Sequence, residues 1–100
     1  MPTPEEIRTY RMIALAALET NPGGFTFIRR NLKDNQGGRC AIGLIGEALH
    51  VSPDFNYDTT VYYTVASLLD TPSQTIWYQN DQIHATYAQV AAALRRMWGL

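Results

Sequence analysis

Cysteine is almost absent from this sequence, because Cys40 is the only one in 100 residues. A single thiol excludes an intramolecular disulfide, and with only two histidines present the sequence argues against a zinc site. We therefore expect neither a bound metal nor a cofactor. An excess of charge of one sign is also lacking, since the formal net charge is −1. This balance excludes a strongly basic nucleic-acid binder and an acidic DNA mimic, which makes nucleic acid a less favoured partner.

Long apolar runs are missing as well. The longest, residues 12–18, is far too short to span a bilayer. Residues 1–10 lack the basic stretch and apolar run of a secretory signal. These absences predict a cytoplasmic protein that has no membrane partner.

The composition that remains is that of a folded globule, with 46% apolar and 17% charged residues. One hundred residues suffice for one core, and we found neither a repeat nor a linker that divides the chain. We therefore expect a single domain over residues 1–100.

Four helices are predicted from apolar stripes and end signals. The first begins at a capping box, in which Thr3 caps, Pro4 takes the first helical position and Glu6 follows three residues after Thr3; it ends at residues 21–24, NPGG. Two others cover about residues 40–50 and 60–69, and the last is opened by a second capping box of Thr86 and Gln89.

Two glycines, Gly43 and Gly46, lie inside the second predicted helix, where each costs up to about 1 kcal/mol. We expect close contact with a neighbouring backbone to compensate for this cost. Residues 51–58 are predicted to form a loop.

Two further segments are predicted to be extended. Phe25, Thr26 and Phe27 alternate as a strand does, and residues 73–81 place Ile76 and Trp77 where they can pair with that segment. The predicted fold class is thus mainly α, with α+β as the alternative: about four helices with one or two short strands.

One set of residues resembles a known family. Cys40, Ala41 and Gly43 form the pattern C-A-x-G on an apolar helix. Trp77 follows, and Asn80 and Asp81 then form N-D. Thr86 and Val90 belong to T-x-x-Q-V at the start of the last helix. This order resembles a family of small bacterial and phage-associated domains of unknown function. In that family the tryptophan directly precedes Asn-Asp, whereas Tyr78 and Gln79 intervene here. The resemblance implies that the Cys40 helix and the Asn80–Asp81 segment belong to one framework.

Cys40 has two interpretations. A helix N-terminus and Arg39 favour a thiolate, and His84 with Asp81 then completes the catalytic set of a cysteine-dependent hydrolase or transferase. Alternatively, Cys40 is a buried, inert apolar side chain beside Ala41, which we favour because free cysteines are among the most buried residues. Asn80 and Asp81 are residue types that form turns, and this structural role is preferred over catalysis or cation binding.

The densest group of basic residues is Arg29, Arg30, Lys33 and Arg39, with Gly37–Gly38 just before a helix. Backbone amides at a glycine-led helix start hold anions, and arginines reinforce such a site. The lysine and Ser/Thr of a phosphate-binding loop are missing. The alternative is a solvated, charged loop.

Tyrosines add flat contact area with a polar tip, and we single out Tyr62 and Tyr78 for recognition. The leading hypothesis is a non-enzymatic binding module that engages a partner protein or an anionic, nucleotide-like ligand. Small phage-type domains include inhibitors of host systems, so inhibition is one form of this hypothesis.

The last predicted helix carries a long apolar stripe, from Tyr87 through Val90 and Leu94 to Trp98, and an alanine-rich flank. A core of this size does not suffice to cover both surfaces, so we expect a symmetric homodimer through this helix. The alternative is that Trp98 folds back onto the first helix and the protein stays monomeric. A structural subunit assembling through the same helix is a third, weaker hypothesis for function.

Overall fold

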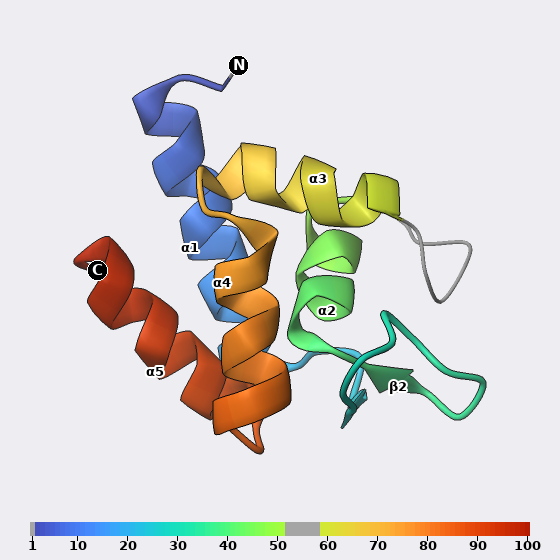
Figure 1. Cartoon of the computed structure of the whole chain (residues 1–100). Helices are drawn as coiled ribbons and strands as arrows, with labels where there is room; N and C mark the ends of the chain where they lie inside the picture. Colours follow the sequence, from blue (N-terminus) through green and yellow to red (C-terminus); the bar gives the residue numbers. More distant parts are fainter. Residues whose placement is uncertain (1, 52–58) are drawn as a thin grey trace.

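The computed structural model describes residues 2–51 and 59–100. Met1 and residues 52–58, which include most of the predicted loop and Tyr57, lie outside the described part. The elements follow along the chain in this order: α1 (Pro4–Thr20), β1 (Thr26–Phe27), β2 (Gly38–Arg39), α2 (Ala41–Ala48), α3 (Thr59–Leu69), α4 (Ser73–Tyr78), the π-helix η1 (Gln79–Ile83) and α5 (Tyr87–Trp98) (Figure 1). The protein is mainly helical with one small sheet, which confirms the predicted fold class.

Helix α1 begins and ends where the sequence predicts. The Thr3 hydroxyl accepts a hydrogen bond from the Glu6 amide at 3.1 Å, and the Glu6 carboxylate accepts one from the Thr3 amide at 2.9 Å, which confirms the capping box. Asn21 ends the helix in the left-handed region, with φ of 42°. Because α1 packs against α2, α3 and α5, its apolar residues extend beyond one face.

Strand β1 of the small sheet pairs with a different segment from the predicted one. Strand β1 forms at the Phe25 segment as expected, but it pairs in parallel with β2, with Thr26 opposite Gly38. The prediction that residues 73–81 are extended is wrong, because they form α4 and the start of η1. Ile76 and Asn80 are both buried and lie four residues apart, which is the spacing of one helical face.

The two glycines of α2 confirm the predicted backbone contact. A Cβ atom on Gly43 would clash with the Leu32 carbonyl oxygen, and one on Gly46 would lie 3.0 Å from the Val51 carbonyl oxygen. Only glycine therefore fits at position 43 without displacing the chain.

Helix α5 is capped by Thr86, whose hydroxyl accepts a hydrogen bond from the Gln89 amide at 3.2 Å. In a full capping box the Gln89 side chain would also accept a hydrogen bond from the Thr86 amide. Here it accepts one from the Ala85 amide instead. Of the predicted stripe, Tyr87, Val90 and Leu94 are buried within this chain.

Trp98 folds back over the helices of its own chain. Its indole N–H donates to the Thr71 hydroxyl at 2.9 Å, and the Arg11 guanidinium lies 5.0 Å from its ring centre on the α1 side. The stripe on which the homodimer prediction rests is thus largely covered, although Met97 stays 47% exposed. The oligomeric state stays a prediction.

One apolar cluster joins α1, α2, α3, α4 and α5, and partly buried aromatic and aliphatic residues pack against it. Among the described residues, no helix combines the length and the apolar character that crossing a bilayer requires.

Candidate binding site

Asn80, which precedes the site residue Asp81, joins three parts of the chain. It lies in η1 and is only 1% exposed. Its side-chain oxygen accepts a hydrogen bond from the Ala41 amide at 2.8 Å, at the start of α2, and its amide nitrogen donates to the Ile28 carbonyl at 3.1 Å. These hydrogen bonds join the Cys40 helix to the Asn80–Asp81 segment. The segment is a π-helix, so the predicted turn is wrong. π-Helices are rare and occur frequently at functional sites.

Asp81 holds the backbone of Arg30 in an unusual conformation. One carboxylate oxygen of Asp81 accepts hydrogen bonds from the Arg30 amide at 3.1 Å and from the Asn80 side chain at 2.7 Å. The φ of Arg30 is 74°, in the left-handed region that favours glycine. A non-glycine residue in such a conformation costs about 1–3 kcal/mol, and strain of this kind concentrates at functional sites.

Four residues from separate parts of the chain line a pocket of about 260 Å³: Arg30, Tyr62, Trp77 and Asp81. Arg30 follows β1, Tyr62 lies in α3, Trp77 in α4 and Asp81 in η1. Within the described residues, the guanidinium of Arg30 makes no hydrogen bond or ion pair. The pocket thus combines an uncommitted cationic donor, a carboxylate and two aromatic side chains.

Two of the six predicted binding residues, Arg30 and Tyr62, line this pocket. A third, Tyr78, is 49% exposed and adjoins Trp77 in α4. Trp77 and Asp81 were not among the predicted binding residues. Their spacing of four residues is the signal that finds them once residues 73–83 are recognised as helical.

The other predicted basic residues do not join Arg30 in an anion site. Arg39 forms an ion pair with Glu47 at 2.9 Å and lies over the ring of Phe25, at 4.4 Å from its centre. Arg29 donates to the His84 carbonyl at 2.7 Å. Lys33 is half-buried in a bridge opposite Arg39. These contacts fix loops and strands to the helical core.

The start of α2 offers few free amides to an anion. The Ala41 amide is bound to Asn80, and the Gly43 amide donates to the sulfur of Cys40 at 3.4 Å. The anion site predicted for this glycine-led helix start therefore lacks two of the donors on which it depends.

Cys40 is buried, as predicted, and only 4% exposed. Burial away from water raises the pKa of its thiol to about 11, and the nearby charge of Asp81 acts in the same direction. The thiol is therefore protonated at neutral pH. His84 forms its ring hydrogen bond with the Gln79 side chain at 3.0 Å. Cys40 thus lacks the exposure that the hydrolase alternative requires, and the ring of His84 bonds to Gln79 instead of the thiol.

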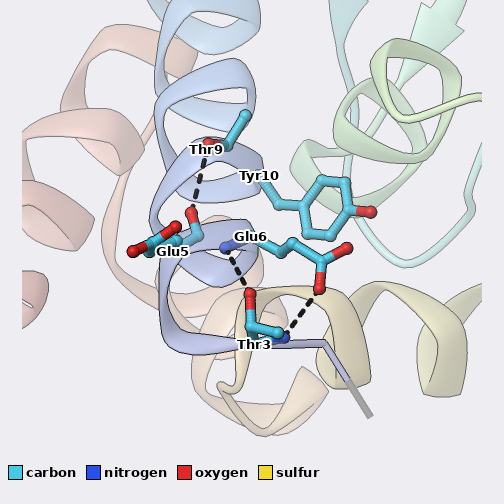
Figure 2. A pocket seen from close by; sticks show the side chains of 5 residues that line it. All are labelled: Thr3, Glu5, Glu6, Thr9 and Tyr10. Atoms are coloured by element: carbon cyan, nitrogen blue, oxygen red, sulfur yellow. Dashed lines mark hydrogen bonds between the residues drawn. The ribbon is translucent and has the colours of Figure 1, made fainter.

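A second pocket, of about 280 Å³, lies at the start of α1 (Figure 2). Thr3, Glu5, Glu6, Thr9 and Tyr10 line it. The polar groups of Thr3 and Glu6 bond to each other in the helix cap, and the Thr9 hydroxyl donates to the Glu5 carbonyl (Figure 2). These groups serve the helix start, so this pocket offers little specific chemistry to a ligand.

Among the residues described, no group of three or more histidine, cysteine or acidic side chains is arranged to hold a metal ion. Comparisons with protein-family models, with curated proteins and with solved structures found no significant match. The resemblance to the phage-associated family therefore stays a prediction.

Proposed function

We propose that the protein is a small, non-enzymatic binding module that recognises a partner protein through the pocket of Arg30, Tyr62, Trp77 and Asp81. The observation that carries the proposal is Arg30: its backbone is held in a strained conformation by Asp81, while its guanidinium has no partner among the described residues. A strained backbone that holds an arginine without a partner beside two aromatic rings is suited to recognition.

The residue types favour a protein partner over a nucleotide-like ligand. Arginine, tyrosine and tryptophan dominate the energetics of protein–protein contacts. A doubly charged phosphate, in contrast, exceeds the single positive charge of Arg30, and Asp81 adds a negative charge to the same pocket. Inhibition of a host system through such a contact is the specific form of this proposal that the sequence suggests.

Affinity capture from cells that carry the gene, followed by chemical cross-linking, tests the proposal with two matched variants. Arg30→Gly removes the guanidinium but keeps the amide that donates to Asp81, and glycine accepts the φ of 74° without strain. Arg96→Ala removes the same charge from an exposed position on α5.

We expect one protein to be captured by the wild type and by Arg96→Ala, and to be lost with Arg30→Gly. Equal capture by all three, or no captured protein, would refute the proposal. A nucleotide retained in native mass spectrometry in place of a protein would also refute it.

A further inference from the structure

Most of the hydrogen-bonding capacity that the described residues leave open in the pocket is that of a donor. The guanidinium of Arg30 carries five N–H groups, and none of them bonds to the described residues. In Asp81, by contrast, one carboxylate oxygen already accepts two N–H groups, from Arg30 and Asn80. Arg30 is exposed, so its guanidinium is available to a ligand, and the group that complements it best is an anionic acceptor.

The remaining lining of the pocket is aromatic. Tyr62 comes from α3 and Trp77 from α4, and both line the pocket together with Arg30. A ligand that reaches Arg30 thus also meets two aromatic side chains.

Size and charge limit the anion. Sites that enclose a whole drug-sized molecule have about 300–1,000 Å³, whereas this pocket has about 260 Å³, which suits a single side chain. The charges of Arg30 and Asp81 offset each other, so a singly charged carboxylate leaves the pocket closer to charge balance than a doubly charged phosphate does.

From these observations we infer that the partner presents an acidic peptide segment, with an Asp or Glu carboxylate paired to Arg30 and an adjacent apolar side chain against Trp77 and Tyr62. This inference rests on the proposed function and adds the chemistry of the partner to it.

Selection from a randomised peptide-display library on the wild-type protein tests the inference, followed by affinity measurement with labelled synthetic peptides. We expect selected peptides to carry an acidic residue next to a large apolar one. Their affinity should fall about tenfold or more for Arg30→Gly, because a charge-assisted hydrogen bond is lost, and should not change for Arg96→Ala.

The matched peptide, in which the acidic residue is replaced by its amide, should bind the wild type and Arg30→Gly equally. This coupling places the carboxylate on Arg30. Selected peptides that depend on Arg30 but carry no acidic residue would overturn the inference and leave the proposed function standing. Selected acidic peptides that bind Arg30→Gly as well as the wild type would overturn both, as would the absence of any selected peptide.

Discussion

The side chain of Asn80 offers the most direct test of how this fold is held together. Asn80→Ala removes two hydrogen bonds, to the Ala41 amide and to the Ile28 carbonyl. Ala41 is fully buried, so its amide loses its only side-chain acceptor in a place that water does not reach. Each buried group left unpaired costs about 1–3 kcal/mol, and the void adds to this cost. We expect the free energy of unfolding to fall by about 2–5 kcal/mol.

Urea unfolding followed by circular dichroism measures this loss. Gln82→Ala is the matched control, because Gln82 is exposed in the same π-helix and should change stability by about 0.5 kcal/mol or less. A loss below about 1 kcal/mol for Asn80→Ala would refute the reasoning that Asn80 joins η1 to α2.

Asn80→Asp refines the same prediction. It keeps an oxygen for the Ala41 amide but places a second carboxylate against Asp81, where the present side chains lie 2.7 Å apart. Two carboxylates so close do not both ionise, so one pKa is raised in the folded state. The folded state then holds its proton more tightly than the unfolded chain does. The deficit in stability relative to the wild type should therefore grow as the pH rises from about 4 to about 7.

Three further predictions concern the core. Gly43→Ala should destabilise the protein by about 1–3 kcal/mol or more in urea unfolding, because the new methyl group meets the Leu32 carbonyl, which itself accepts from the Cys40 amide; an unchanged midpoint would contradict the packing of α2. Burial raises the pKa of Cys40 to about 11, above its ordinary value of 9.0, so stability should fall by up to about 3 kcal/mol as the pH rises from 9.0 to about 11. Cys40→Ser keeps a cap for the Gly43 amide and should remove the loss of stability that comes from the thiol. Thiol labelling of the native wild type at neutral pH should be far slower than labelling of the unfolded chain. Fast labelling of the native protein would restore the hydrolase hypothesis. Trp98→Ala should lower stability by about 2 kcal/mol, because Trp98 packs on its own chain, and should leave the sedimentation coefficient unchanged at micromolar concentration. A dimer that dissociates in this variant would support the homodimer predicted from the last helix.

The sequence predicts the long helices because their signals are local. Helix α1 has its capping box and its NPGG end, and α3 and α5 have apolar stripes at helical spacing, so short stretches suffice to identify them. Helix α4 has six residues, and the segment SQTIWYQND carries only a few apolar residues. Its helical character depends on the burial of Ile76 and Asn80 against other elements, which no local pattern reveals.

The sequence predicts only part of the candidate site, because only part of it depends on local signals. Arg30 was found because basic residues cluster in its loop, but the sequence does not tell it apart from Arg39, whose charge is taken by Glu47 eight residues later. Asp81 was assigned to a turn because its helix was not recognised. The left-handed backbone of Arg30 depends on a hydrogen bond between residues 51 positions apart.

The indole N–H signals of the two tryptophans test the central claim most directly, by NMR of the ¹⁵N-labelled wild type during titration with a selected acidic peptide. Trp77 lines the pocket, whereas Trp98 is not among the lining residues, bonds to Thr71 and serves as an internal control. The account predicts that the Trp77 signal shifts with saturation, that the Trp98 signal stays in place, and that Arg30→Gly weakens the response about tenfold or more. A Trp77 signal that does not move, or a shift confined to Trp98, would contradict the account.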